Sequence, residues 1–154
     1  MNLGLNEKVF VISGSSRGIG LGIAAALAAE NAHVLLNGRN QEDLKAAYHT
    51  VSDIGAGDVL CVQGDITESS VVSDILQVSE EKWGRIDGVI ANAGAVKTVP
   101  NWDIDKKDWQ WFLDSNLIVA TQFVTPLISL LTKTKGSIVF IGSIAGIEEI
   151  GAPL

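Results

Sequence analysis

The sequence has little positive charge and almost no cysteine. Its 154 residues carry 11 Lys and Arg against 18 Asp and Glu, a formal net charge of −7. Binding to nucleic-acid phosphates takes clustered basic side chains, so this balance argues against a nucleic-acid partner. The single cysteine, Cys61, cannot form an internal disulfide, and we therefore expect a cytoplasmic protein.

Long apolar runs and clusters of metal ligands are also missing. No segment approaches the run of about 20 apolar residues that a membrane span needs, and the N-terminus lacks the pattern of a signal peptide. We therefore expect no membrane partner. The two histidines, His33 and His49, have no cysteine or carboxylate cluster beside them, which predicts no metal site. Cys61 lies in an apolar run and is expected to be an inert core residue.

A glycine-rich stretch over residues 13–20 is the most informative feature that is present. It follows a short apolar segment and opens an alanine-rich one, as a turn between a buried strand and a helix does. Such a turn binds phosphate, because glycines let backbone N–H groups approach the anion and the helix N-terminus adds its dipole. We expect Gly14 to permit the tight turn, Gly18 to permit approach of a pyrophosphate, and Gly20 to let the helix pack closely. Hydroxyl donors are expected from Ser13, Ser15 and Ser16. The alternative is an ordinary turn that uses glycine for its backbone freedom.

Short apolar runs alternate with longer helical stretches along the chain, which is the pattern of βαβ units. Strands are expected near residues 8–13, 33–37, 58–62, 87–91 and 136–142, and helices near 18–31, 41–53, 68–82 and 108–132. Right-handed crossovers favour a doubly wound parallel sheet of order 3-2-1-4-5. Residues 1–154 are thus expected to form a single α/β dinucleotide-binding domain of the Rossmann type.

Polar and glycine-rich segments follow every expected strand. Because the carboxyl ends of parallel strands meet at one edge of a sheet, these segments predict a ligand site where the winding reverses. They are residues 14–20, 37–39, 64–65, 92–94 and 142–143.

Together these segments resemble the short-chain dehydrogenase/reductase family, and within it the 3-oxoacyl-carrier-protein reductase type. The motifs appear in the family's order: Ser13-Gly14-x-x-x-Gly18-x-Gly20, Gly64-Asp65, Asn92-Ala93-Gly94, Asn116 and Ser143. The resemblance implies an oxidoreductase that interconverts a carbonyl and an alcohol on a small-molecule substrate. It also implies a homo-oligomer in the full-length form.

The resemblance further implies roles for individual residues. Asp65 and the backbone of Ile66 would contact adenine, Asn116 would hold a water in a proton relay through its carbonyl, and Ser143 would donate to the substrate carbonyl. Read without the family, Asp65, Ser143 and the Asn92 to Gly94 segment are equally turn residues, and Asn116 could mark a local bend. The cofactor-binding set is Gly14, Ser15, Ser16, Arg17, Gly18, Ile19, Gly20, Arg39, Asp65, Ile66, Asn92, Ala93 and Gly94.

The choice of cofactor can be argued from charge. A carboxylate at the end of the second strand would bind the ribose 2′-hydroxyl of NAD(H) and repel a 2′-phosphate. Residues 37–40 hold no carboxylate, and Arg17 and Arg39 offer forked hydrogen bonds to a phosphate. This favours NADP(H) over NAD(H), the alternative being two solvated surface arginines.

The family's proton donor, a Tyr in a Tyr-x-x-x-Lys motif, is not found. The only tyrosine, Tyr48, lies in an expected helix with no lysine four residues later. We therefore expect an N-terminal portion of a longer reductase that is inactive by itself, with the strand near 136–142 left as an open edge. The alternative is a non-catalytic nucleotide-binding pseudoenzyme or regulatory protein.

Overall fold

The computed structural model describes residues 3–97 and 104–148. Five strands form one sheet in the order β3-β2-β1-β4-β5, which confirms the predicted topology. All neighbouring strands are parallel. The strands are β1 (Val9–Ile12), β2 (His33–Gly38), β3 (Val59–Gln63), β4 (Gly88–Ala91) and β5 (Ser137–Phe140). The chain winds outward from β1 to β3 and returns to β4 on the other side of β1, so the winding reverses between β1 and β4.

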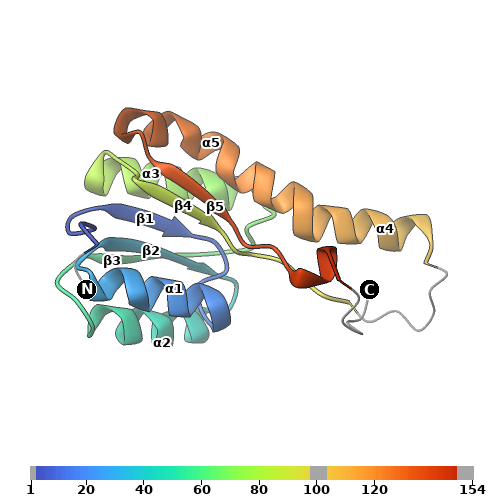
Figure 1. Ribbon diagram of the computed structural model, residues 1–154, viewed down its shortest axis with the longest axis horizontal. Coiled ribbons are helices and arrows are strands. Elements are labelled where there is room, and N and C mark those ends of the chain that lie inside the picture. The colour runs from blue at the N-terminus through green and yellow to red at the C-terminus, as the bar shows by residue number, and fades with distance from the viewer. Residues whose placement is uncertain (1–2, 98–103, 149–154) are drawn as a thin grey trace.

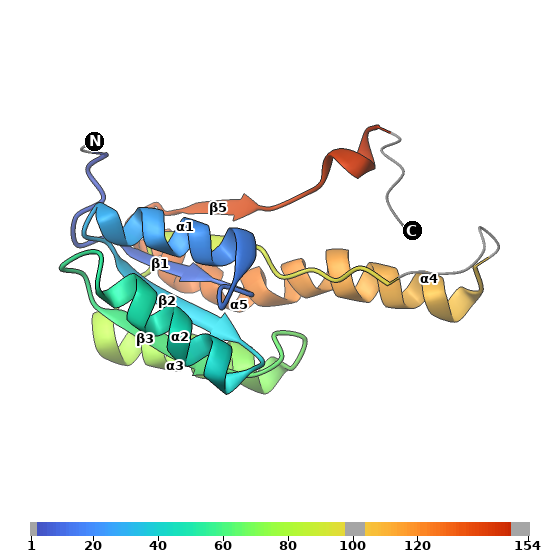
Figure 2. The same ribbon diagram turned by 90° about the horizontal axis from the view of Figure 1, so that it is seen from below.

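Helices cover both faces of the sheet (Figures 1 and 2). α1 (Gly18–Ala29) and α2 (Gln41–Ser52) lie on one face, and α3 (Ser69–Trp83) and α5 (Val119–Thr134) lie on the other. Successive strand residues point to opposite faces, so Val11 joins the core under α3 and α5 while Ile12 joins the core under α1 and α2. The continuous apolar run of β1 therefore follows from burial on both faces.

The long helix expected over 108–132 is longer and less regular than the sequence suggests. It comprises α4 (Lys106–Leu113), a π-helical segment (Asp114–Ile118) and α5. Pro126 lies inside α5 without ending it. The irregular backbone lies instead at the π segment, which contains Asn116. Single π turns inside α-helices frequently occur at functional sites.

By length and composition alone, the stretch Lys106–Thr134 could cross a membrane, since its mean hydropathy reaches 1.4. A third of its most apolar window is buried, and Phe123 and Leu127 lie in the core with side chains of β4 and α3. A core helix that covers a parallel sheet meets the same two criteria, so this packing accounts for its apolar face.

The two edge strands differ from the interior ones. β3 leaves Cys61 exposed, so the expected core position is wrong, because an edge strand is covered less completely than a central one. Partial burial raises the pKa of the Cys61 thiol to about 11, so the thiol is protonated at neutral pH. Among the described residues, β5 pairs with β4 alone and exposes Ile138, Val139 and Phe140, as expected of an edge strand.

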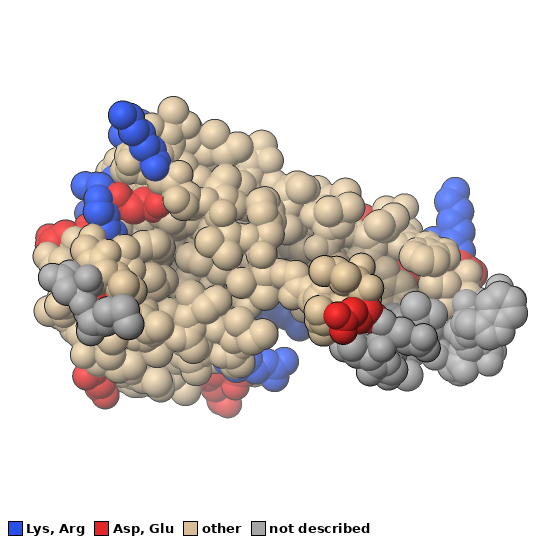
Figure 3. Space-filling model, viewed as in Figure 1, with Lys and Arg blue, Asp and Glu red and all other residues tan. Residues whose placement is uncertain are grey.

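The face of the molecule shown in Figure 3 carries its charges in scattered groups. On the described part of the face shown in Figure 3, Lys and Arg side chains form small separate groups on a largely uncharged surface. This distribution, with the net charge of −7, offers no continuous basic band for a nucleic acid on that face.

Candidate cofactor site

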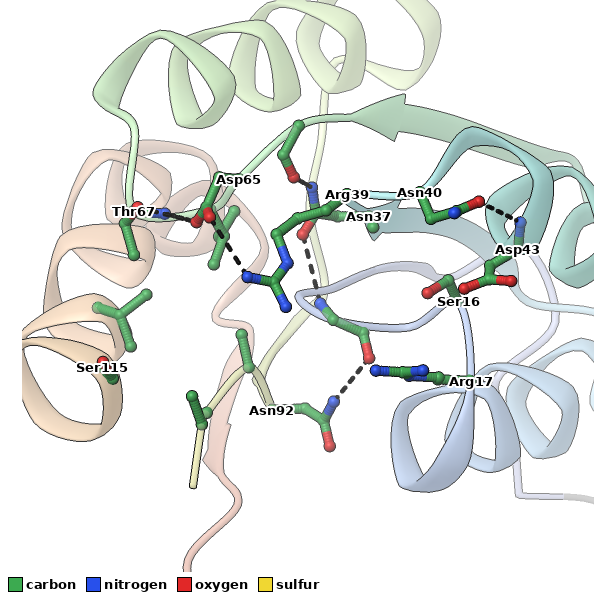
Figure 4. Close-up of a pocket in the computed structure, with 18 of the residues that line it drawn as sticks. Ser16, Arg17, Asn37, Arg39, Asn40, Asp43, Asp65, Thr67, Asn92 and Ser115 are labelled. Carbon is green, nitrogen blue, oxygen red and sulfur yellow. Dashed lines mark hydrogen bonds and ion pairs between the residues drawn. The ribbon is translucent and has the colours of Figure 1, made fainter. Parts of the chain in front are cut away.

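A cavity of about 640 Å³ lies at the carboxyl edge of the sheet. The segments that follow β1, β2, β3 and β4 line it, together with side chains of α4, the π segment and α5 (Figure 4). Of the residues predicted from the sequence, nine line this cavity: Gly14, Ser16, Arg17, Arg39, Asp65, Ile66, Asn92, Ala93 and Gly94. Four of the five expected strand-end segments thus meet at one site.

The glycine-rich turn has the backbone that its glycines allow. Gly14 and Gly18 have φ angles of +61° and +58°, the left-handed region that favours glycine. A Cβ on Gly20 would lie 2.5 Å from the carbonyl oxygen of Gly14 and 2.9 Å from Cα of Ser15. Gly20 therefore lets the first turn of α1 approach the loop that precedes it, in keeping with the predicted role.

Two of the three serines of this turn do not offer their hydroxyls to a ligand. Ser15 is fully buried; its Oγ donates to the carbonyl of Ile12 and accepts from the amide of Asn37. Ser13 Oγ accepts from the amides of Asn92 and Ala93, both at 3.0 Å. In this structure both hydroxyls tie the turn to neighbouring strands, so these contacts give the donor roles predicted for Ser13 and Ser15 no support. Ser16 alone of the three lines the cavity.

Asn37 is a structural residue of the site that the sequence argument missed. Its side chain is buried at the end of β2, where Oδ1 accepts from the amide of Gly14 and Nδ2 donates to the carbonyls of Val62 and Gly64. It thus joins the segments after β1, β2 and β3. A polar residue at the end of the otherwise apolar run of β2 was the available signal.

Asn92 also binds the glycine-rich turn through its side chain, from the end of β4. Its Nδ2 donates to the carbonyls of Ser13 and Gly14, both at 3.0 Å, and so fixes the end of β4 against the turn (Figure 4). Asn37 and Asn92 together hold Gly14 from two sides. The turn is therefore rigid before any ligand arrives, which lowers the entropy cost of binding.

The N-terminus of α1 is open toward an anion. Its N-cap residue, Arg17, makes no side-chain hydrogen bond to the first turn, and that turn holds no acidic residue. By contrast, Asn40 caps α2 and Asp105 caps α4, each accepting two backbone amides. The first N–H groups of a helix need partners, and a bound phosphate supplies them.

Charged side chains gather at the end of the cavity near β2 and β3. Arg39 Nη1 lies 3.6 Å from Asp65 Oδ2, and Thr67 donates both its amide and its hydroxyl to Asp65 Oδ1 (Figure 4). The Thr67 amide, with the Thr67 hydroxyl and the Arg39 charge, holds the pKa of Asp65 below its usual range. Asp43 also lines this end, a carboxylate that the sequence argument did not consider.

Asn116 lies just outside the cavity lining and fastens the loop after β4. Its side chain forms two hydrogen bonds with the backbone of Ala95, to the amide at 3.1 Å and to the carbonyl at 3.0 Å. A Cβ on Gly94 would lie 2.9 Å from Asn116 Oδ1, so glycine permits this contact. Ala95, which Asn116 contacts, and Ser115, which precedes Asn116 in the chain, both line the cavity.

Ser143 follows β5 and caps a short 3₁₀ turn (Ile144–Gly146), its Oγ accepting from the amide of Ala145. It is not among the residues that line the cavity. Tyr48 is on α2 and does not line the cavity either. Among the described residues that line the cavity there is no tyrosine.

Comparison with known proteins identifies this arrangement. Residues 8–152 match the family described as short chain dehydrogenase. The chain belongs to the short-chain dehydrogenase family. This confirms the resemblance seen in the motifs.

Curated short-chain dehydrogenases that resemble the chain are considerably longer. The CLA biosynthesis dehydrogenase/reductase of Lactiplantibacillus plantarum is 33% identical over 146 residues, which cover 93% of this chain and 50% of the relative. An uncharacterized oxidoreductase of Staphylococcus saprophyticus is 30% identical, with 94% of this chain and 62% of the relative covered. The chain thus spans about half to three-fifths of the length of these relatives.

Solved structures of the family have the same fold. The L-sorbose reductase of Gluconobacter frateurii, solved with NADPH and L-sorbose, superposes with a TM-score of 0.90 at 27% identity. That match covers 99% of this chain and 59% of the reductase. Levodione reductase gives a TM-score of 0.86 at 26% identity over 95% of this chain.

The short-chain dehydrogenase family binds NAD(P), and the residues present fit such a cofactor. The uncapped N-terminus of α1, opposite the positive-φ glycines, suits a pyrophosphate, and Asp65 with Ile66 lines the end of the cavity suited to adenosine. Four predicted members of the cofactor set do not line the cavity: Ser15 is buried in the turn, and Gly18, Ile19 and Gly20 form the start of α1.

Proposed function

We propose that this chain is the cofactor-binding part of an NADP(H)-dependent oxidoreductase that interconverts a carbonyl and an alcohol on a small-molecule substrate. The observation that carries the proposal is the open N-terminus of α1 at the switch point between β1 and β4. There, a rigid glycine turn leaves helix N–H groups without a side-chain cap. The dipole of α1 and these N–H groups favour a pyrophosphate over a neutral ligand.

The preference for NADP(H) rests on charge at the adenosine end. Arg39 and Arg17 line the cavity, and the end of β2 carries Asn37 where a carboxylate would select NAD(H). Guanidinium groups bind phosphate through forked, charge-assisted hydrogen bonds. Asp65, which forms an ion pair with Arg39, opposes this preference, so we expect it to be moderate. The similar L-sorbose reductase was solved with NADPH.

In the reaction we propose, the bound cofactor supplies or accepts a hydride. Ser143 would donate a hydrogen bond to the substrate carbonyl, and the backbone carbonyl of Asn116 would hold a water of the proton relay. The π segment supports the second role, because its backbone departs from regular α-helical hydrogen bonding at Asn116.

We further propose that the 154-residue chain binds the cofactor without turnover. General acid–base catalysis needs a proton donor within hydrogen-bond reach of the carbonyl. Tyr48 is on α2 and does not line the cavity, so it cannot fill this role. The same observation supports the second candidate, a non-catalytic nucleotide-binding protein, which would show binding and no turnover within any longer chain.

Two properties of the whole protein belong to the same proposal. We propose a homo-oligomer, supported by the exposed apolar side chains of Trp109, Leu113 and Leu117 along the long helix. We propose a cytoplasmic location, supported by the single cysteine, which allows no internal disulfide.

The test is a pair of dissociation constants, for NADPH and for NADH, measured by titration calorimetry on the purified chain. We expect both to bind and NADPH to bind several-fold more tightly. Equal or tighter binding of NADH would refute the preference, and no binding of either would refute the cofactor site. Oxidation of NADPH by this chain with a panel of ketones would contradict the predicted lack of turnover.

A further inference from the structure

The ion pair between Arg39 and Asp65 joins the two side chains that a nucleotide's adenosine end would meet. The Arg39 guanidinium reaches from the end of β2 to the carboxylate that follows β3 (Figure 4). The backbone at Arg39 is fixed as well, because Gln63 Nε2 donates to its carbonyl at 3.2 Å. Of the two arginines that line the cavity, Arg39 therefore already has an anionic partner in the free protein.

We propose that Asp65 is a specificity-determining residue: its carboxylate competes with the nucleotide 2′-phosphate for Arg39 and so limits the selectivity for NADP(H) over NAD(H). This inference rests on the proposed function. A nucleotide without the 2′-phosphate leaves the Arg39–Asp65 pair intact. A nucleotide that carries the 2′-phosphate must either draw Arg39 away from the Asp65 carboxylate or place its phosphate next to that carboxylate.

The two partners differ in freedom to move. Asp65 is held by Thr67, whose amide and hydroxyl donate to Oδ1 at 3.0 and 2.8 Å. The Arg39 side chain is 74% exposed and has a single ion pair in the described residues. Competition is thus decided by the arginine changing partner while the carboxylate stays. Because the pair is exposed, its strength corresponds to a small factor in affinity.

The test compares two ligands that differ by the 2′-phosphate alone: adenosine 2′,5′-bisphosphate and adenosine 5′-monophosphate. The ratio of their dissociation constants, measured by calorimetry on the full chain, reports the contribution of that phosphate. Asp65→Asn keeps the Oδ1 that accepts from Thr67 and removes the charge that faces Arg39. We expect it to raise the selectivity for the bisphosphate about three- to fivefold.

Two controls separate competition from other effects. Asp43→Asn removes a carboxylate from the same cavity that forms no ion pair with Arg39 in the described residues, and we expect a change below about twofold. In an Arg39→Gln background, Asp65→Asn should leave the selectivity unchanged. Circular dichroism and thermal unfolding confirm that each variant is folded.

The outcomes distinguish this inference from the proposed function. No binding of either ligand to the unaltered chain would overturn both. Normal binding with unchanged selectivity in Asp65→Asn, or the same gain in the Arg39→Gln background, would overturn the competition alone. An equal loss of affinity for both ligands would assign Asp65 to adenine contact only and would also overturn it.

Discussion

Replacing Gly20 with alanine tests whether close approach of α1 to the glycine turn builds the site. The new Cβ would lie 2.5 Å from the Gly14 carbonyl oxygen and 2.7 Å from Asn92 Nδ2, so α1 or the turn must shift. Overpacking of this kind costs about 1–3 kcal/mol. Gly22, two residues further along α1, has open space around its Cβ position, so Gly22→Ala is the matched control.

Both substitutions gain the same helix propensity, about 0.5–1 kcal/mol for alanine over glycine. The difference in unfolding free energy between the two variants therefore isolates the close contact. We expect Gly20→Ala to be less stable than Gly22→Ala by about 2 kcal/mol, or roughly 4–8 °C in the unfolding midpoint. Urea titration followed by circular dichroism measures the first quantity.

Binding should separate the two variants further. Displacement of the α1 N-terminus misplaces the N–H groups offered to a pyrophosphate, so we expect Gly20→Ala to weaken NADPH binding at least about tenfold, while Gly22→Ala keeps it. The reasoning is refuted if the two variants match in both stability and affinity, because the contact would then carry neither the fold nor the site.

Further predictions concern the hydrogen-bond network. Asn37→Ala removes the side-chain acceptor of the Gly14 amide and one donor from each of the Val62 and Gly64 carbonyls, so we expect a loss of about 2–4 kcal/mol in urea unfolding; a loss below about 0.5 kcal/mol would contradict it. Asn116→Ala frees the Ala95 amide, so that amide should exchange its hydrogen faster while global stability changes by only about 1 kcal/mol; unchanged exchange would contradict the clamp. Burial raises the pKa of Asp87, but the hydrogen bonds from Arg85 and the Val9 amide and the charges of Arg85 and Lys8 together lower it by more. The pKa of Asp87 therefore lies below its usual value. Its stabilisation is therefore present above about pH 4, the unfolded value, and lost as pH falls through the lower folded pKa. Asp87→Asn should cost about 2 kcal/mol at pH 7 and much less once the pH lies below the folded pKa, and a cost independent of pH would contradict this.

The topology could be predicted from the sequence because its signals are strong and local. Apolar runs such as Val9–Ile12 mark strands buried on both faces, and the crossover rule leaves few ways to order five of them. The positive-φ glycines of the first turn were equally readable, since Gly14 and Gly18 stand at fixed places between a strand and a helix.

The hydrogen-bond partners and positions of individual side chains in the site could not be predicted in the same way. Ser15 looks like a phosphate donor in the sequence, yet its burial turns its hydroxyl toward Ile12 and Asn37. Asp43 is in the first turn of α2, beyond the residues 37–40 at which the sequence argument looked for a carboxylate, yet it lines the same cavity. Such roles depend on which segments meet across the sheet edge, and spacing along the chain carries no information about that.

The most direct test of the central claim is a crystal structure of this chain grown with NADP⁺. The account predicts the pyrophosphate at the uncapped N-terminus of α1, the adenine beside Asp65 and Ile66, and the 2′-phosphate on Arg39 with the Arg39–Asp65 distance lengthened from 3.6 Å. A nucleotide bound elsewhere, or one whose phosphates avoid the α1 N-terminus, would contradict it.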